Sequence, residues 1–345
     1  RGEKNDCTST SLLGPGMEAP YGATPHGIWS DAAHLTIANL TLQDVYYHTI
    51  QFAPKADEPL VYHVKLIDSG EQFIKSSPST YGQGVNRGRV AYSILAYTNG
   101  PSTADHGGGS GYTNGVDVHA GRDWIVENNI FYGFHTPDDS DNLWNPAVLF
   151  WNGASGTITR NNRFIDVDRA IAYGLTKRPS PPKADSKTHT PPHHLYADHA
   201  GGQIVNNMIS LHPGLFSSHR RQNADASILV WNSPNTKVMH NTILNNSNHY
   251  YSIETRFNSS GVVIKNNLSD VTVHARRPET APLIQFNLYR AYPTLFVAAN
   301  IGDLHLKPTA NIRYETAPLL PEVLEDFDGD LRTGKTATPG ADELR

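Results

Sequence analysis

A short motif that ends in Asn recurs along the chain, and each copy is a run of mostly β-branched residues. Asn is one of the few residues that adopt left-handed backbone readily, so it suits a sharp corner. Recurrence at a spacing of roughly 25 residues is typical of a β-solenoid, whose single rungs cannot bury their apolar faces alone. The copies end at Asn128-Asn129, Asn161-Asn162, Asn206-Asn207, His240-Asn241 and Asn266-Asn267, with weaker copies at Ile37-Ala38-Asn39-Leu40 and Val61-Tyr62-His63-Val64. We expect the repeated Asn side chains to form a hydrogen-bonded ladder.

The repeats define the expected organisation of the chain. They run from about residue 34 to 280, which favours one elongated all-β domain over two separate domains. We expect an N-terminal segment and cap over residues 1–33, β-helix rungs over 34–280, and a closing segment and tail over 281–345. No periodicity of 3.6 residues competes with this pattern.

Composition excludes several classes of partner. A net charge of −5 and the absence of a basic run argue against nucleic acid. No apolar stretch approaches the roughly 18 residues of a membrane span. The single Cys7 cannot form an internal disulfide, although an intermolecular bridge is open to it. The chain starts at Arg1 without a signal peptide, and we expect a processed protein that is extracellular or periplasmic.

The repeats and the tail carry a resemblance. The run Asp326-Phe327-Asp328-Gly329-Asp330-Leu331-Arg332, followed by Pro339-Gly340-Ala341-Asp342-Glu343, is similar to the endings of many secreted β-helix proteins. The chain resembles right-handed parallel β-helix proteins of the bacterial secreted type, including polysaccharide lyases. That fold also hosts glycoside hydrolases, epimerases, esterases and non-catalytic surface proteins. Asp326 to Asp330 also resembles a calcium loop, but it lacks the distal Glu of an EF-hand, so we expect an Asx turn.

A second short strand follows in each rung, and its copies can be aligned. Because side chains alternate between the faces of a strand, one column should point into the core. This inward column contains Ile50, Ile74, Val116, Val148, Ile171, Ile228 and Ile253. The adjacent outward column contains Gln51, Lys75, Asp117, Leu149, Ala172, Leu229 and Glu254, and a second outward column contains Ser77, His119, Trp151, Gly174, Trp231 and Arg256.

The outward columns suggest a carbohydrate site. Trp151 and Trp231 flank a rung with only Ala172 and Gly174, and indole rings stack well on the apolar face of a sugar. The alternative is that loops cover both tryptophans as a satellite core. Long insertions flank the same strand at 99–114, 135–145, 212–226 and, on the other side, 176–202, as expected for the walls of a binding trough.

The resemblance implies β-elimination from a uronate-containing polysaccharide, often with Ca²⁺ held by acidic side chains. We expect Lys75 or His119 to act as the base and Arg256 or Arg169 to hold the substrate carboxylate. Asp117 would orient the base or ligate a metal. Trp151, Trp231, Glu254 and Arg122 are the further candidates for substrate contacts.

Several alternatives stay open. Lys75 and Asp117 lie one rung apart, about 4.8 Å, and would also suit a simple ion pair. A glycoside hydrolase needs two carboxyl groups roughly 5–9.5 Å apart, which Asp117 and Glu254 do not provide; Asp123, Asp166, Asp168 or Asp225 would have to supply a partner. A non-catalytic glycan-binding or surface β-helix is the third reading.

Histidines gather in the insertion that follows residue 176. His189, His193, His194 and His199 follow no defined zinc spacing, so the segment is a metal site, a wall against an anionic substrate or a solvated loop. His193 and His199 are the candidate ligands. Glu71 precedes the strand that carries Lys75, and we expect it to support the site from behind.

Overall fold

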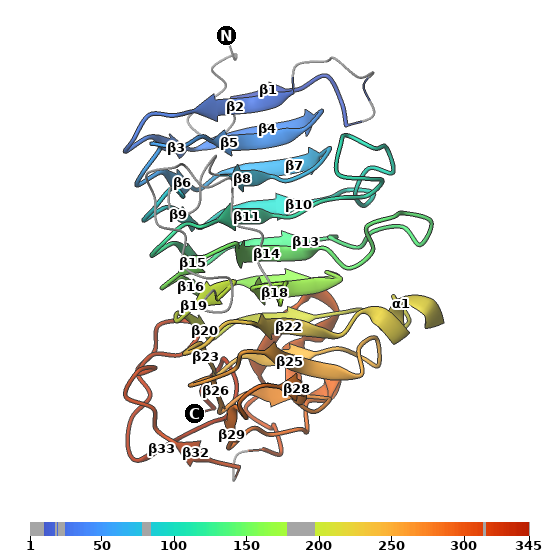
Figure 1. The fold of residues 1–345 in the computed structure, drawn as a ribbon. Helices are drawn as coiled ribbons and strands as arrows, with labels where there is room; N and C mark the ends of the chain where they lie inside the picture. The colour runs from blue at the N-terminus through green and yellow to red at the C-terminus, as the bar shows by residue number, and fades with distance from the viewer. Residues whose placement is uncertain are drawn as a thin grey trace.

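Stacked parallel strands dominate the computed structural model, which describes residues 10–17, 19, 25–77, 84–177, 197–312 and 315–344 (Figure 1). Three long sheets each contain nine strands. Sheet A contains β1 (Thr10–Leu13), β4 (Leu40–Val45), β7 (Lys65–Ser69), β10 (Ile94–Ala96), β13 (Ile130–Tyr132), β17 (Arg163–Ile165), β21 (Met208–Ser210), β24 (Thr242–Leu244) and β27 (Leu268–Ser269). Sheet B contains β2 (His26–Ser30), β5 (His48–Phe52), β8 (Ile74–Ser76), β11 (Val116–His119), β14 (Pro146–Trp151), β18 (Arg169–Tyr173), β22 (Ala226–Trp231), β25 (Tyr251–Phe257) and β28 (His274–Pro278). Sheet C contains β3 (Thr36–Ala38), β6 (Leu60–Tyr62), β9 (Arg89–Ala91), β12 (Ile125–Glu127), β16 (Ile158–Arg160), β20 (Gln203–Val205), β23 (Lys237–Met239), β26 (Val263–Lys265) and β29 (Leu283–Gln285).

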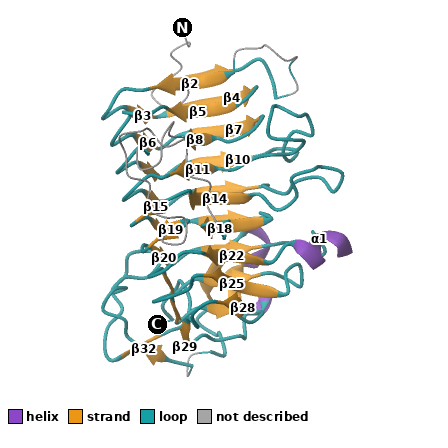
Figure 2. Cartoon of the chain, in the orientation of Figure 1, coloured by secondary structure: helices purple, strands orange, loops and turns teal. Residues whose placement is uncertain are grey.

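The chain visits sheets B, C and A in turn and then starts the next rung, an order that is consistent with the expected parallel β-helix. The stacked strands start before residue 34 and continue past residue 280. Strands and loops make up nearly all of the described chain (Figure 2). The other elements are α1 (Ser218–Asn223), the 3-10 helices Pro293–Leu295 and Ala299–Ile301, and the strand pairs β15 (Ala154–Ser155) with β19 (His199–Ala200), β30 (Phe296–Ala298) with β31 (Asp303–Leu306), and β32 (Ala317–Pro318) with β33 (Thr336–Ala337). Among the described residues, no helix combines the length and the apolar character that a membrane span requires.

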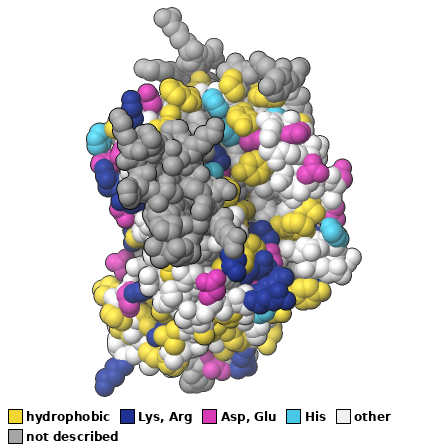
Figure 3. Space-filling view, in the orientation of Figure 1, with side chains coloured by type: hydrophobic (Ala, Val, Ile, Leu, Met, Phe, Trp, Pro, Cys, Tyr) yellow, Lys and Arg dark blue, Asp and Glu magenta, His cyan; other side chains and the backbone are white. Residues whose placement is uncertain are grey.

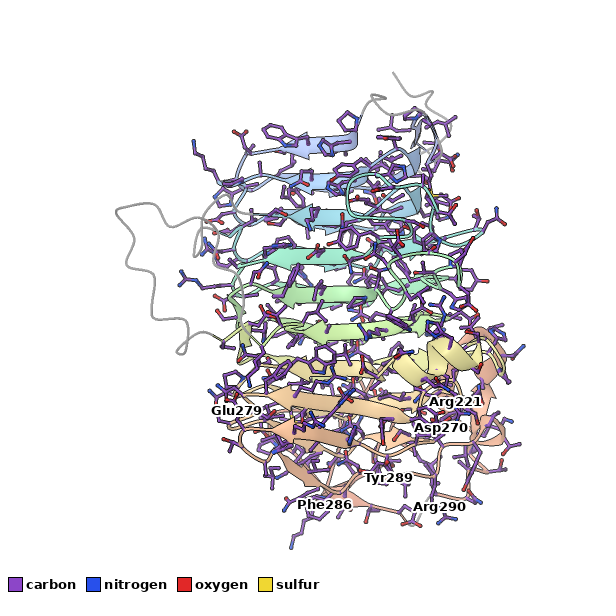
Figure 4. All side chains as sticks on the ribbon, turned by 45° about the vertical axis from the view of Figure 1, so that its right-hand side comes forward. Arg221, Asp270, Glu279, Phe286, Tyr289 and Arg290 are labelled. Atoms are coloured by element: carbon purple, nitrogen blue, oxygen red, sulfur yellow. The ribbon has the colours of Figure 1, made fainter. Side chains whose placement is uncertain are left out.

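A column of left-handed residues forms the corner between sheets C and A. Nine consecutive rungs place a non-glycine residue with positive φ there: Asn39, His63, Tyr92, Asn128, Asn161, Asn206, His240, Asn266 and Phe286. The motif therefore marks this corner, and its residues have the left-handed backbone that the sequence predicted. The sequence pattern missed Tyr92 and Phe286, because neither has the short polar side chain that usually favours this conformation. Phe286 lies at the lower end of the coil, near Tyr289 (Figure 4).

The second Asn of each motif points inward and forms the expected ladder. Side-chain amides donate from Asn129 to Asn162 and from Asn162 to Asn207, each at 3.0 Å. The chain of bonds continues through Asn241 and Asn267 to Asn287 at 2.9, 3.0 and 2.8 Å. Each buried amide thereby provides a hydrogen-bond partner for the amide of the next rung. The ladder therefore sets the register of the whole stack.

The core lies between the three sheets. All seven residues of the predicted inward column belong to this main core, whereas Leu149, Ala172 and Leu229 of the outward column pack in a separate cluster, which confirms the register inferred from the sequence. The C-terminal segment, red in Figure 1, lies beside the lower rungs. Its Asp326 carboxylate accepts from the backbone N–H groups of Asp328 at 3.1 Å and Asp330 at 2.9 Å, which is the predicted Asx turn. Cys7, His189, His193 and His194 lie outside the described residues.

Candidate functional site

The outward face of sheet B has the register that the sequence predicted. Asp117 pairs with Lys75 on one side and with Leu149 on the other, and His119 pairs with Trp151. Further down, Ala172 pairs with Leu229, Leu229 with Glu254, and Trp231 with Arg256. The side chains of the two columns nevertheless gather into two separate clusters, with a pocket between them.

The upper cluster centres on Asp117. Its carboxylate forms an ion pair with Lys75 and accepts from the indole N–H of Trp151 at 2.9 Å. Nε2 of His119 lies 3.4 Å from the same carboxylate, and the ring of His119 meets Trp151 edge-on at 4.7 Å between centroids. Asp117 has no exposed surface, and Lys75 is 8% exposed, whereas His119 and Trp151 are half-buried. His119 is therefore the most accessible base candidate of the cluster.

Two polar contacts fix the orientation of the His119 ring. Nζ of Lys75 lies 3.1 Å from Nε2, and the side-chain amide of Asn152 lies 2.9 Å from Nδ1. Which ring nitrogen donates depends on the tautomer of the imidazole. His119 is thus held between Lys75 and Asn152.

Charge keeps Asp117 ionised. Burial alone would raise the pKa of its carboxyl group, but Lys75 and then His119 overcome this effect and hold the pKa well below its ordinary value. Glu71, behind Lys75, differs: burial raises its pKa to about 7, against the opposing charge of Lys75 and a hydrogen bond from the Gly108 N–H at 3.1 Å. Two carboxyl groups near one lysine therefore have opposite protonation tendencies.

The lower cluster centres on Asp225, which precedes β22. Its carboxylate bridges Arg169 and Arg256 and also meets Arg276 at 3.1 Å. Nε of Arg256 lies 2.5 Å from Glu254, and the Arg256 guanidinium lies 3.8 Å from the centroid of the Trp231 ring. This arrangement explains why Arg256 and Arg169 are largely buried although both carry a charge.

The lower cluster has excess positive charge. Three guanidinium groups, from Arg169, Arg256 and Arg276, face the two carboxyl groups of Asp225 and Glu254. Burial raises the pKa of Glu254, although the charge of Arg256 opposes this increase. The two carboxyl groups therefore do not balance the charge of the three guanidinium groups. Figure 3 shows Lys and Arg side chains gathered on this face at the level of β18 to β25. An anionic ligand would compensate the excess.

A pocket of about 340 Å³ lies between the two clusters. Trp151 and Leu149 come from β14, and Arg169 comes from the start of β18. The flanking loops contribute Tyr112, Leu175 and the stretch Asp141–Asn145 with Trp144, so two of the four predicted insertions, 99–114 and 135–145, line the pocket. Aromatic walls with one guanidinium suit a sugar ring that carries an acidic group.

The structure separates the two predicted platform tryptophans. Trp151 lines the pocket and stays partly exposed. Trp231 is 7% exposed and packs with Leu149, Ala172, Ala226 and Leu229 in a satellite core. Trp151 packs against the same core from its partly exposed position, so Trp231 has the burial expected of the core alternative, and the platform stays a prediction for Trp151.

The predicted catalytic residues do not all meet at one point. His119 and Arg256 lie four rungs apart, which is about 19 Å at the usual strand spacing. One sugar unit cannot contact both. Arg169, which lines the pocket together with Trp151, is the guanidinium nearer to the upper cluster.

Other predicted residues lie elsewhere. Arg122 is exposed in the turn after β11, and its backbone N–H donates to Asn86 at 3.1 Å. His199 is buried, and its ring nitrogens lie 2.9 Å from the hydroxyl of Thr157 and 2.8 Å from that of Ser233. These two hydrogen bonds give both ring nitrogens of His199 a partner without a metal ion. Burial lowers the pKa of this histidine to about 3.

Asp168 and His135 serve the loop that carries α1. The buried carboxylate of Asp168 pairs with Arg220 of α1 at 2.6 Å and with Nδ1 of His135 at 2.6 Å. Arg220 has no exposed surface. This network fixes the helix against the sheet, next to Arg221, which Figure 4 labels. Sequence reasoning did not anticipate it, because the two ends of the pair are 52 residues apart.

Asn152 and Trp144 are site residues that the sequence analysis missed. Asn152 follows β14 with a φ of 52°, and its place in a left-handed turn directly after Trp151 was the available signal. Trp144 belongs to an irregular loop, so strand register does not predict its position. No protein-family model, curated protein or solved structure matches this chain.

Proposed function

We propose that the outward face of sheet B binds an acidic polysaccharide and cleaves it by β-elimination at a uronate unit. The proposal includes a right-handed β-helix of the secreted bacterial type that acts outside the cytoplasm. One observation carries it: the pocket that contains Trp151 and Arg169 lies between a partly exposed His119 and a cluster of arginines with excess positive charge.

In the proposed reaction, substrate binding releases Nε2 of His119 from its contact with Lys75, and Nε2 then removes the proton at C5 of the uronate. The electron pair of the C–H bond forms the C4–C5 double bond, the C4–O bond breaks, and solvent protonates the leaving oxygen. Asn152 holds the imidazole through Nδ1, and the ionised Asp117 stabilises the imidazolium that forms.

Arg169 neutralises the carboxylate of the reacting sugar, which acidifies the C5 proton. Trp151 stacks on the ring of that sugar and fixes its orientation. Arg256 and Arg276 then interact with a different acidic unit of the same chain, further along the sheet. Substrates of several sugar units should therefore react faster than short ones, since remote binding energy contributes to orientation.

Calcium does not fit the upper cluster. One carboxylate oxygen of Asp117 is engaged by Lys75 and the other by Trp151, and a calcium site needs several free oxygen ligands. Among the described residues, the side chains that come within metal-binding distance of one another as a group of three are His305, Asp328 and Asp342, in the C-terminal segment. We assign no step to a metal, and chelation by EDTA is expected to leave the activity unchanged.

Binding without catalysis is the second candidate. The mutual pairing and burial of Lys75 and Asp117 favour it, because the same contacts would serve a purely structural face. The hydrolase alternative has less support: Asp117 and Glu254 are four rungs apart, about 19 Å, and no water-sized access reaches the fully buried Asp117.

The test is incubation with a panel of uronate polymers while the absorbance of the unsaturated product is followed. Activity is expected on at least one polymer, with a loss of at least 100-fold in His119→Ala. Arg122→Ala, which changes an exposed residue of the same rung, is the matched control and should retain activity. Saturable binding of an acidic polymer without any product would replace the lyase proposal with the binding one.

A further inference from the structure

The corner column between sheets C and A is used in its lower half to hold the C-terminal segment. Side-chain amides of Asn161, Asn206 and Asn266 each donate to a backbone carbonyl of that segment, at Phe327, Glu325 and Pro318, in each case at 2.8 Å. His240 lies between them and contacts the carbonyl of Gly340 at 3.2 Å. Four consecutive rungs thus bind polypeptide backbone through the same left-handed position.

Apolar contacts accompany these hydrogen bonds. The first residues of the lower sheet A strands, Met208, Thr242 and Leu268, are buried under the C-terminal segment. On the sheet C side, Leu320 and Val323 of the segment pack on Val205 and Met239, as shown by their common cluster. The segment is acidic, and Glu322 pairs with Lys237 at 2.9 Å. The lower corner therefore recognises extended backbone with apolar and acidic side chains.

The upper half of the same column has no such cover from the described part of the chain. Asn39, His63 and Tyr92 are exposed, and Asn128 is half-buried. The sheet A positions in register with Met208 are Ile94 and Ile130, which are half-buried. A groove of about 380 Å³ lies over these residues. It shares Tyr92 and Asn128 with a second hollow, of about 490 Å³, that is bordered by residues 321–329.

The groove is therefore a continuation of the surface that the C-terminal segment already occupies, and it starts where that segment turns back at Asp326 to Asp330. The charge of the groove also complements an acidic segment. Lys65 is exposed along the groove, and in the adjoining hollow Arg89 and Arg160 share the single carboxylate of Glu127.

We propose that this upper corner groove, lined by Asn39, His63, Tyr92, Ile94 and Asn128, binds an extended segment of a partner polypeptide. The segment has apolar side chains interspersed with acidic ones, and its backbone carbonyls accept from the corner side chains as the C-terminal segment does below. The partner is another protein rather than a second copy, because the corresponding segment of each copy is held by its own coil through four corner contacts and the buried Arg332. This site is independent of sheet B.

The probe is a fluorescein-labelled peptide with the sequence of residues 318–330, titrated with the full chain and followed by fluorescence anisotropy. We expect saturable binding that Ile94→Glu weakens at least tenfold. Ile301→Glu changes an exposed isoleucine of the C-terminal segment and is the matched control, with no expected effect. Asn128→Gly keeps the left-handed backbone but removes the amide, and should weaken binding several-fold.

Circular dichroism and melting temperature verify that each variant is folded, which is expected for substitutions on a half-exposed surface. A peptide with Leu320 and Val323 replaced by Ser should bind at least tenfold more weakly than the original. The proposal is overturned by the absence of saturable binding, or by binding that Ile94→Glu does not change, since the peptide would then displace the native segment below. It is also overturned if the groove variants weaken binding of an oligosaccharide instead, or dissociate a dimer of this chain.

Discussion

Removal of the Lys75 charge is the most informative perturbation of the sheet B face. In Lys75→Met the carboxylate of Asp117 keeps only the Trp151 N–H and the edge of His119, and it has no contact with solvent. Breaking a buried ion pair from one side typically costs about 3–5 kcal/mol, because the remaining charge stays buried. Because Asp117 keeps its hydrogen bond from Trp151, we expect the lower end of this range. The free energy of unfolding should fall by about 3 kcal/mol at pH 7.

The double variant Lys75→Met/Asp117→Leu removes both charges and extends the apolar surface of Leu149 by one rung. The Trp151 N–H and Nε2 of His119 lose their partners, and both side chains are partly accessible to water. Stability should therefore return to within about 1–2 kcal/mol of the wild type. The measurement is urea unfolding followed by circular dichroism in both directions, so that reversibility is tested before free energies of unfolding are compared.

The pH dependence gives the sharper test. In the wild type the folded pKa of Asp117 is lowered below the ordinary value of 3.8, so its contribution is present above that pH and is lost as the pH falls further. In Lys75→Met, burial outweighs the remaining contacts of Asp117 with Trp151 and His119 and should raise the pKa, so the penalty develops as the pH rises above about 4. The difference between wild type and variant should be large at pH 7 and small at pH 4. An equal difference at both values, or a loss below about 1 kcal/mol, would refute the idea of a confined ion pair.

Three further outcomes are expected. Trp151→Ala should weaken binding of acidic oligosaccharides at least tenfold in a calorimetric titration, with little change in melting temperature. Trp231→Ala should mainly lower the melting temperature. The reverse result would show that Trp231, and not Trp151, is the sugar-stacking residue. Asn207→Ala interrupts the ladder and leaves its buried hydrogen-bond partners unsatisfied, so the free energy of unfolding in urea should fall by about 2–4 kcal/mol. Asn128→Ala should lower it by no more than about 1 kcal/mol. Equal losses in the two variants would show that the ladder does not contribute to stability. The raised pKa of Glu71 means that stability falls as the pH rises from about 4.5 to 7, and Glu71→Gln should abolish this part of the fall in melting temperature; an unchanged pH profile would argue against a protonated Glu71.

Register is the property that the sequence predicted well. A left-handed corner residue in each rung and strict alternation in the following strand place Lys75 beside Asp117 and Trp231 beside Arg256, and the strand pairing confirms both. The extent to which each side chain is buried was not predictable in the same way. Trp231 is buried because Arg256 lies across its ring and the satellite core packs beneath it, which depends on side-chain direction rather than on register.

Loop positions are the other part that sequence reasoning did not reach. Trp144 and Asp225 are in irregular segments whose lengths differ from rung to rung, so their distance from the sheet is not set by the repeat. Arg169 was predicted as a candidate, but its place in the pocket follows from its position at the first residue of β18, where the loop of residues 135–145 comes close.

The net charge of −5 and the proposed acidic substrate are compatible, because charges are separated along the molecule. At physiological ionic strength, exposed charges more than about 8 Å apart are largely screened from each other. The acidic C-terminal segment lies on the corner between sheets C and A, where Asn161 and Asn206 donate to its backbone carbonyls. The arginines around Asp225 lie on sheet B. What an approaching polyanion meets is therefore the local excess of guanidinium groups, and the overall charge of the chain has little influence on its binding.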